Sequence, residues 1–169
     1  EVFANADACR VNAAFADIII PVEWVKEKRS PLKTRETLRR AAAAFADERL
    51  LLIFPSGRLA LKDAGKLVER DWFSTAVSLA RKNKAPVTPL HVKAQNSPLF
   101  YFFSKVSREL KDITLFNELL NKQGDVFELT FGPQIAPDEL AGDPQDVTNR
   151  LRTYVTDILP NDPDRKFGE

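Results

Sequence analysis

Short apolar runs alternate with amphipathic segments along the chain, and this alternation most restricts the folds available to it. The runs lie within residues 2–4, 16–22, 50–54, 85–92 and 125–132. Apolar runs of this length are typical of strands, because a buried helix needs a longer segment with apolar residues spaced near 3.6. Strands that alternate with helices indicate an α/β fold. We expect a mixed, mostly parallel sheet flanked by helices.

The intervening segments predict four helices. Ser30-Pro31 or Thr34 opens the first, because a hydroxyl can accept from free amides and proline suits the first turn. Asp71 is the predicted N-cap of the second, and Ser97-Pro98 opens the aromatic segment PLFYFF. Residues 61–70, LKDAGKLVER, are predicted to be a polar loop. The expected inward faces are Leu38, Ala42 and Phe45; then Phe73, Val77 and Ala80; and finally Val147, Leu151, Tyr154 and Ile158.

Length and composition indicate one domain over residues 1–160, followed by a polar tail over 161–169. The 169 residues are 44% hydrophobic and 29% charged, as in ordinary globular proteins. A net charge of +1 gives no global field that would attract nucleic acid, so no nucleic-acid partner is expected. The single cysteine, Cys9, excludes an internal disulfide, and no Cys/His cluster has metal-ligand spacing. We expect neither a metal nor a bound cofactor.

The run Leu50–Phe54 predicts a central strand, and it stops at Pro55-Ser56-Gly57-Arg58. Proline ends the hydrogen-bond ladder, and glycine adopts backbone conformations unfavourable for other residues. Backbone amides after a strand can converge on an anion, and the Arg58 guanidinium would add a fork suited to phosphate. The alternative is a capped strand end with a solvent-facing arginine.

The order of four motifs between residues 2 and 133 resembles the later sequence blocks of the glycerol-phosphate and lysophospholipid acyltransferase family. These motifs are IIIPVEW, IFPSGR, APVTPLHV and NSPLF. The family's Phe-Pro-x-Gly falls on Phe54–Gly57. The resemblance implies that Ser56, Gly57 and Arg58 bind the acceptor's phosphate or polar head, with Arg58 one position early. Ser56 replaces a usual glutamate and Trp24 a frequent arginine, which argues against plain glycerol phosphate.

The family's catalytic motif, His-x-x-x-x-Asp, does not occur in this chain. In that motif histidine removes a proton from the acceptor hydroxyl, and aspartate orients the imidazole. The resemblance places it upstream of Glu1, so the acyltransferase domain is expected to be N-terminally incomplete here. No catalytic residue is assigned within the chain. The one histidine, His91, precedes Val-Lys-Ala-Gln-Asn and is interpreted as a structural residue.

The resemblance implies transfer of a fatty acyl group to a lysophospholipid or glycerol-phosphate-like acceptor in phospholipid biosynthesis. The donor would be acyl-CoA or acyl carrier protein, used as a cosubstrate. Such an enzyme would be cytoplasmic and peripheral to the inner membrane. A non-catalytic lipid- or acyl-chain-binding domain of the same fold is the alternative. A serine hydrolase is disfavoured, because Phe54 and Arg58 occupy the glycine positions of the Gly-x-Ser-x-Gly elbow.

Aromatic residues raise the question of membrane contact. Phe100, Tyr101, Phe102 and Phe103 cover nearly all directions around a helix. This pattern favours a helix buried against the sheet. The alternatives are a wall of an acyl-chain site and a bilayer contact in which Lys105 and Arg108 meet lipid phosphates. The pair Arg39-Arg40 is interpreted as a solvated helix face, with phosphate contact as the alternative.

Overall fold

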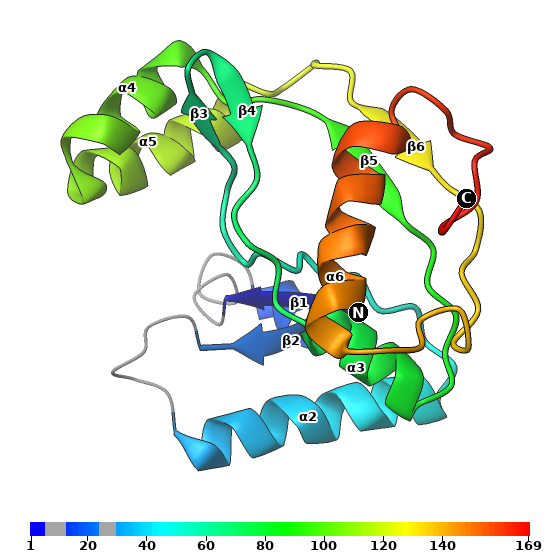
Figure 1. The fold of residues 1–169 in the computed structure, drawn as a ribbon. Coiled ribbons are helices and arrows are strands. Elements are labelled where there is room, and N and C mark those ends of the chain that lie inside the picture. Colours follow the sequence, from blue (N-terminus) through cyan, green and yellow to red (C-terminus); the bar gives the residue numbers. More distant parts are fainter. Residues whose placement is uncertain (6–12, 24–29) are drawn as a thin grey trace. The chain divides into compact units, whose positions relative to one another are not determined.

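A computed structural model of the chain describes residues 1–5, 13–23 and 30–169 (Figure 1). Trp24 and Cys9 lie outside the described residues. The chain divides into two compact units, each built from three segments. Unit 1 comprises residues 1–57, 72–87 and 136–148, and unit 2 comprises residues 58–71, 88–135 and 149–169. The single domain expected over residues 1–160 stays a prediction.

Unit 1 contains a parallel pair of strands covered by helices. Strand β1 (Val2–Asn5) pairs in parallel with β2 (Ile19–Val22), and the short helix η1 (Ala13–Asp17) precedes β2. Helices α2 (Pro31–Ala46) and α3 (Thr75–Lys82) complete the unit with the first part of α6 (Pro144–Thr153). The core holds Phe3, Ile20, Ala41, Ala44 and Leu79. Each of these side chains is almost fully removed from water, which is the main stabilising term here.

The prediction of a central strand over residues 50–54 is wrong, because only one residue of this run pairs with a strand. Leu52 alone forms a bridge, parallel to Val2, with Leu52 N donating to Glu1 O at 2.8 Å and Phe3 N donating to Leu52 O at 3.0 Å. Leu50 and Phe54 are 79% and 56% exposed. The hydrogen bonds of Leu52 go to the β1 side. They align the middle of residues 50–54 with β1, but they do not extend a strand to both ends of this run.

Helix α2 begins where the sequence predicts, but it buries a different face. The Ser30 hydroxyl accepts from Lys33 N at 3.3 Å, and Pro31 is the first helical residue. Ala41 and Ala44 are buried, whereas Leu38 and Ala42 are exposed and Phe45 is half-buried. The inward face is therefore rotated from the predicted one, because the small alanines permit a close approach to the parallel strands.

Helix α3 begins later than expected. Thr75 is its first residue, Ser74 is its N-cap, and Asp71 lies outside the helix. Phe73 is exposed, while Val77 and Ala80 are buried as predicted. Asp71 instead accepts a hydrogen bond from Arg152 Nη1 at 2.9 Å, an ion pair within unit 2. A long-range partner thus takes the carboxylate that the local sequence suggested as a cap.

Unit 2 contains two antiparallel strand pairs, a helical hairpin and the C-terminal segment. Residues 61–70 form the pair β3 (Leu61–Asp63) and β4 (Lys66–Val68) rather than the predicted loop. Ala64 and Gly65 join them with φ of +45° and +80°, as in tight hairpin turns. Three-residue strands are too short to show an alternating pattern, so this hairpin has no periodic signal in the sequence.

Strand β5 (Leu90–Lys93) pairs with β6 (Glu128–Phe131). Phe127, Leu129 and Phe131 lie at alternate positions along this segment and are exposed. The opposite face packs on the turn η3 (Tyr154–Ile158), where His91 Nδ1 lies 3.0 Å from Val155 O. A two-stranded sheet with one face packed in this way leaves the other face to solvent.

Helices α4 (Pro98–Val106) and α5 (Arg108–Leu120) form a hairpin hinged at Ser107. Helix α6 continues into η3, where Tyr154 and Leu159 are buried. The C-terminal tail is attached to this region. The Phe167 ring lies edge-on to Tyr154 with 5.7 Å between ring centroids, and Tyr154 donates its hydroxyl hydrogen to Arg165 O at 2.5 Å.

The mixed α/β class is confirmed, but a mostly parallel sheet is not. The described strands form three two-stranded sheets, one parallel and two antiparallel. Among the described residues, no helix is both long enough and apolar enough to cross a bilayer.

Candidate functional site

The segment Phe54–Gly57 forms a closed turn after the Leu52 bridge. Phe54 O accepts from Gly57 N at 2.9 Å, with Pro55 and Ser56 as the central residues. Gly57 has φ of +59°, in the left-handed region that favours glycine. The expectation that Gly57 uses its conformational freedom is confirmed. A side chain here would cost about 1–2 kcal/mol in backbone strain.

A second contact fixes the turn in unit 1. Pro55 O accepts from Phe73 N at 3.1 Å, which ties the turn to the residues before α3. Trp72, next to Phe73, is buried, and its carbonyl accepts from Gln145 Nε2 at 3.0 Å. Hydrogen bonds at Phe54 O and Pro55 O therefore fix the conformation of the turn and attach it to the start of α3.

The three predicted site residues differ in exposure. Ser56 is 5% exposed, Gly57 is half-buried and Arg58 is exposed. Ser56 and Gly57 end the first segment of unit 1, and Arg58 begins unit 2. Of the three, Arg58 is thus the exposed residue. Binding of an acceptor's polar head by this trio stays a prediction.

His91 has the structural role that its sequence context suggested. It lies on β5, half-buried, with Nδ1 against Val155 O at 3.0 Å. On the same face, Lys93 Nζ and Glu128 Oε2 form a cross-strand ion pair of 2.9 Å. Nothing in this arrangement pairs the imidazole with a carboxylate, as the family's His-x-x-x-x-Asp chemistry requires.

Sequence reasoning missed a buried carboxylate in the α4–α5 hairpin. Glu118 is 5% exposed, accepts from Ser97 N at 2.8 Å and from the Ser97 hydroxyl, and lies 3.5 Å from Lys122 Nζ. Burial raises the pKa of this carboxyl, but the Ser97 hydrogen bonds and the Lys122 charge outweigh it and lower the pKa below 4.5. The only sequence signal was the cap at Ser97, which gives no indication of a partner 21 residues away.

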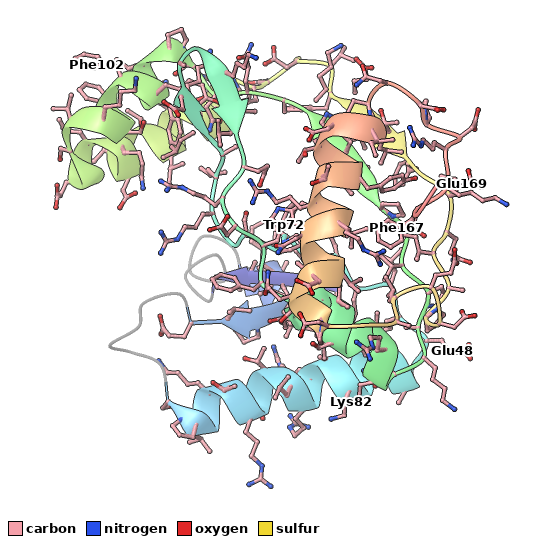
Figure 2. All side chains as sticks on the ribbon, viewed as in Figure 1. Glu48, Trp72, Lys82, Phe102, Phe167 and Glu169 are labelled. Atoms are coloured by element: carbon pink, nitrogen blue, oxygen red, sulfur yellow. The ribbon has the colours of Figure 1, made fainter. Side chains whose placement is uncertain are left out.

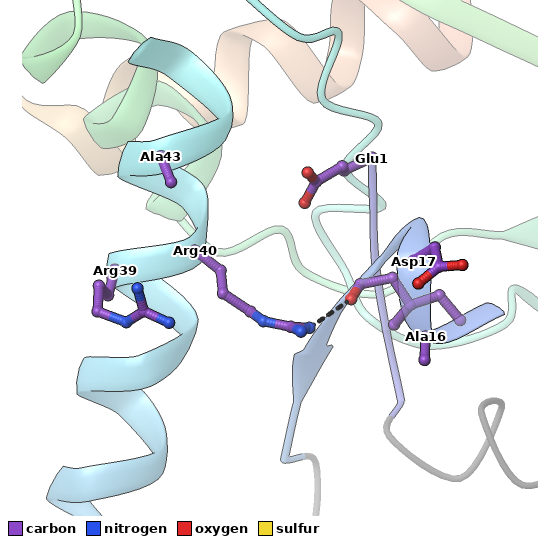
Figure 3. A pocket seen from close by; sticks show the side chains of 7 residues that line it. Glu1, Ala16, Asp17, Arg39, Arg40 and Ala43 are labelled. Atoms are coloured by element: carbon purple, nitrogen blue, oxygen red, sulfur yellow. Dashed lines mark hydrogen bonds between the residues drawn. The ribbon is translucent and has the colours of Figure 1, made fainter. Parts of the chain in front are cut away.

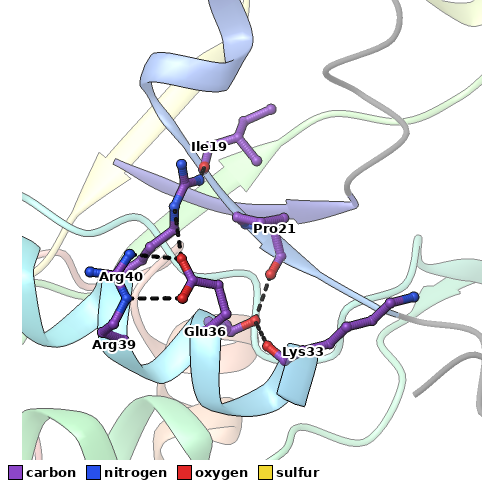
Figure 4. Close-up of polar contacts among 7 residues, drawn as sticks. Ile19, Pro21, Lys33, Glu36, Arg39 and Arg40 are labelled. Carbon is purple, nitrogen blue, oxygen red and sulfur yellow. Dashed lines mark hydrogen bonds and ion pairs between the residues drawn. The ribbon is translucent and has the colours of Figure 1, made fainter. Parts of the chain in front are cut away.

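The pair Arg39-Arg40 lies beside a small cavity in unit 1 (Figure 3). The cavity of about 140 Å³ is lined by Glu1, Ala16, Asp17, Ile19, Arg39, Arg40 and Ala43. Arg40 donates from Nη1 to Ile19 O at 3.0 Å, as Figures 3 and 4 show. The lining therefore combines two guanidinium groups with two carboxylates, which gives no preference for an anion.

The Arg39 guanidinium is paired with the Glu36 carboxylate. Arg39 donates to both Glu36 oxygens at 2.8 and 2.9 Å, and Arg40 Nε lies 3.9 Å from the same carboxylate (Figure 4). The hydrogen bond from Arg39 lowers the pKa of Glu36. Arg39 is exposed, as expected for a solvated face, whereas Arg40 instead connects α2 to β2.

No group of acidic, histidine or cysteine side chains suited to a metal ion occurs among the described residues. A shallow groove of about 520 Å³ runs along the first turns of α2, lined by Ser30, Pro31, Thr34, Arg35 and Leu38. The cap at Ser30 already satisfies the Lys33 amide there. The turn at Phe54–Gly57 thus remains the candidate site.

The chain is similar in sequence to a known acyltransferase. The chain is 26% identical over 109 residues to a lyso-glycine lipid O-acyltransferase of Phocaeicola vulgatus, across 61% of this chain and 39% of that protein. The chain therefore matches well under half the length of this relative. No protein-family profile matches the chain, and no solved structure matches it. That relative's name describes an O-acyltransferase that acts on a lyso-glycine lipid.

Proposed function

We propose that the protein belongs to an acyltransferase that moves a fatty acyl group from a thioester donor to a hydroxyl of a lysolipid. The acceptor oxygen attacks the thioester carbonyl while a general base removes its proton. The carbon–sulfur bond then breaks, and the thiol leaves with a proton. Acyl-CoA or acyl carrier protein is the proposed donor. The resemblance assigns the base to a His-x-x-x-x-Asp segment upstream of Glu1.

The proposed binding role of this chain lies at the turn after Phe54. The Gly57 amide donates to Phe54 O and so closes the turn, and the exposed Arg58 that follows has a guanidinium that can form two hydrogen bonds with a planar anion. This geometry suits a carboxylate as well as a phosphate. The relative's name specifies a glycine lipid, whose head group can present a carboxylate. An anionic lysolipid, rather than plain glycerol phosphate, is therefore the proposed acceptor class.

One observation carries the proposal: similarity to a lipid O-acyltransferase coincides with a Phe-Pro-x-Gly turn whose glycine has a positive φ. A peripheral position on the cytoplasmic face of the inner membrane follows as part of the same proposal, because both the acceptor and the product would be bilayer lipids.

Acyl transfer is tested with the purified protein, radiolabelled acyl-CoA or acyl carrier protein, and a panel of acceptors in detergent micelles. The panel holds a lyso-glycine lipid, a lysophosphatidic acid and glycerol phosphate. Transfer to a lysolipid supports the proposal, and the acceptor preference identifies the head group. Binding of lysolipid without transfer, by protein that includes the upstream motif, would favour the non-catalytic lipid-binding alternative.

Arg58→Ala is the specific test of the turn. Loss of a charge-assisted hydrogen bond to an anionic head should raise the apparent KM for the lysolipid about tenfold, since such bonds contribute about 1.5–3 kcal/mol. Arg70→Ala is the matched control, because Arg70 is another exposed arginine in unit 2. Steady-state kinetics at saturating donor measure the effect. Equal KM values for Arg58→Ala and wild type would reject the assignment.

A further inference from the structure

The outer side of α4 carries an exposed apolar strip made of Leu99, Phe102 and Val106. These side chains are 48%, 61% and 62% exposed, although all three are large and apolar. Figure 2 shows Phe102 projecting from α4. The opposite side of the helix is occupied by Phe100 and Tyr101, which are buried within the protein. This nine-residue helix is apolar on both sides, and only one of these sides is buried within unit 2.

The strip is held in a defined orientation. The Phe100 and Tyr101 rings meet edge-on at 5.4 Å, and Tyr101 accepts from Asn96 N at 3.1 Å. Glu118 binds both the backbone and the hydroxyl of Ser97, the N-cap of α4. Phe102 is braced edge-on by Phe103 at 5.5 Å. Exposed apolar groups on so well fixed a helix indicate an interaction surface rather than a loose segment.

One cation lies along an edge of the strip. At 100° per residue, Lys105 lies about 60° from Phe102 around the helix axis. Lys105 is exposed. Lys62 from β3 instead places its ammonium group 4.9 Å from the centroid of the ring of Tyr101, the buried residue on the opposite side of α4. The strip with Lys105 at its edge is the arrangement in which an apolar face enters lipid while a lysine meets head groups.

Two of the three acidic side chains of α5 are paired with lysines. Asp112 pairs with Lys111 at 3.1 Å and Glu118 pairs with Lys122 at 3.5 Å, while Glu109 accepts from the Ser107 hydroxyl at 2.7 Å. Lys105 therefore supplies the positive charge at the edge of the strip. This charge complements an anionic bilayer surface.

We propose that the α4 strip, Leu99, Phe102 and Val106, inserts into the head-group region of an anionic phospholipid bilayer while Lys105 contacts lipid phosphates. The proposal rests on the proposed function, because an enzyme that acylates a lysolipid must reach an acceptor held in a membrane. It selects the bilayer contact over the fully buried helix that the sequence pattern favoured. The side chain of Arg108, named with Lys105 in that alternative, lies outside the described residues.

Vesicle flotation tests the strip. The wild-type protein should float with vesicles of phosphatidylcholine and phosphatidylglycerol, and Phe102→Ser/Val106→Ser should lower its partition constant at least about tenfold. The matched control is Phe131→Ser/Val92→Ser, because Phe131 is 59% exposed and Val92 42% exposed on the β5–β6 pair. The control should float as the wild type does.

Insertion is distinguished from surface adhesion by fluorescence quenching. In Phe102→Trp the new indole should be quenched by brominated phosphatidylcholine in the vesicles, measured as the difference from wild type with its two native tryptophans. In Phe131→Trp the same difference should be near zero. Lys105→Gln should lower partition onto phosphatidylglycerol-containing vesicles about fivefold and leave partition onto pure phosphatidylcholine unchanged.

Three results would overturn the proposal: no flotation of the wild type, equal flotation of wild type and Phe102→Ser/Val106→Ser, or equal loss in the control. Self-association that only Phe102→Ser/Val106→Ser abolishes, with no flotation, would assign the strip to a second copy of the chain. Flotation needs no acyl donor, so it is independent of acyl transfer. If vesicle binding depends on Phe102 but protein that includes the upstream His-x-x-x-x-Asp motif transfers no acyl group, the membrane surface is supported and the proposed function is rejected.

Discussion

At the scale of single residues, the side chains that the sequence marked and those that the structure makes important are different sets. Gly57 was marked for its conformational freedom, and its φ of +59° confirms this. Glu118 was not marked at all, yet it is the buried carboxylate on which the start of α4 depends. A local sequence pattern can identify a residue, such as Gly57, whose role depends only on its neighbours in the chain. A buried charge is defined by partners that only folding brings near.

Glu118→Gln should destabilise the protein by about 1–3 kcal/mol, because it removes the charge from two hydrogen bonds with Ser97. Urea unfolding followed by circular dichroism measures the change. Asp112→Asn is the control: Asp112 is exposed, so its pair with Lys111 should contribute less than about 1 kcal/mol. An equal loss in the two variants would contradict the role assigned to Glu118.

The same carboxyl predicts a direction for the pH dependence. Since the pKa of Glu118 is lower in the folded protein than its ordinary value of 4.5, its stabilising contribution is fully present above that value. The contribution is lost as the pH falls through the folded-state pKa. The stability difference between wild type and Glu118→Gln should therefore be constant near neutral pH and shrink below about pH 4.5. A difference that grows on acidification would contradict this.

At the scale of elements, helix starts followed from the sequence more reliably than buried faces did. Ser30 and Ser97 cap α2 and α4 as predicted, because a hydroxyl before proline acts within one turn. The predicted buried face of α2 was wrong, because the observed face is rotated around the helix axis. Four consecutive alanines give no hydrophobic contrast from which the buried side could be predicted. The position of the strands beside α2 decided which alanines face inward.

Leucine substitutions in this alanine run test that rotation. Ala44→Leu should overpack the core of Phe3, Ile20 and Leu79 and lower the free energy of unfolding by about 1–3 kcal/mol. Ala42→Leu, on the exposed side of the same helix, should change it by less than about 0.5 kcal/mol. Chemical denaturation of both variants gives the comparison. A larger decrease in the free energy of unfolding for Ala42→Leu than for Ala44→Leu would instead support the buried face predicted from the sequence.

At the scale of the whole molecule, the chain forms two compact units that each draw on distant segments. Sequence patterns suggested one domain with no linker, because the segments of each unit are interleaved along the chain. The core of unit 1 includes Phe3, Ala44 and Leu79, and the buried residues of unit 2 include Phe100 and Leu159. Two cores built from interleaved segments leave no compositional boundary to read.

Hydrogen exchange measured by mass spectrometry should map these two cores. Peptides containing Ile20, Ala44, Phe100 or Leu159 should exchange slowly, because these residues are buried among ordered elements. A peptide over residues 124–127, before β6, should exchange within the earliest time points, since Val126 is 95% exposed. Rapid exchange at Ile20 or Phe100 would contradict the assignment of the cores.

The sequence by itself determined the mixed α/β class, the capped starts of α2 and α4, the turn with its glycine at positive φ, and the resemblance to acyltransferases. Each depends on residues within a few positions of one another. Only the tertiary structure decided the extent of the predicted strand at 50–54, the buried alanines of α2, the partner of Glu118 and the exposed strip on α4. These depend on which surfaces meet in space, and contacts between distant segments leave no periodic signal in the sequence.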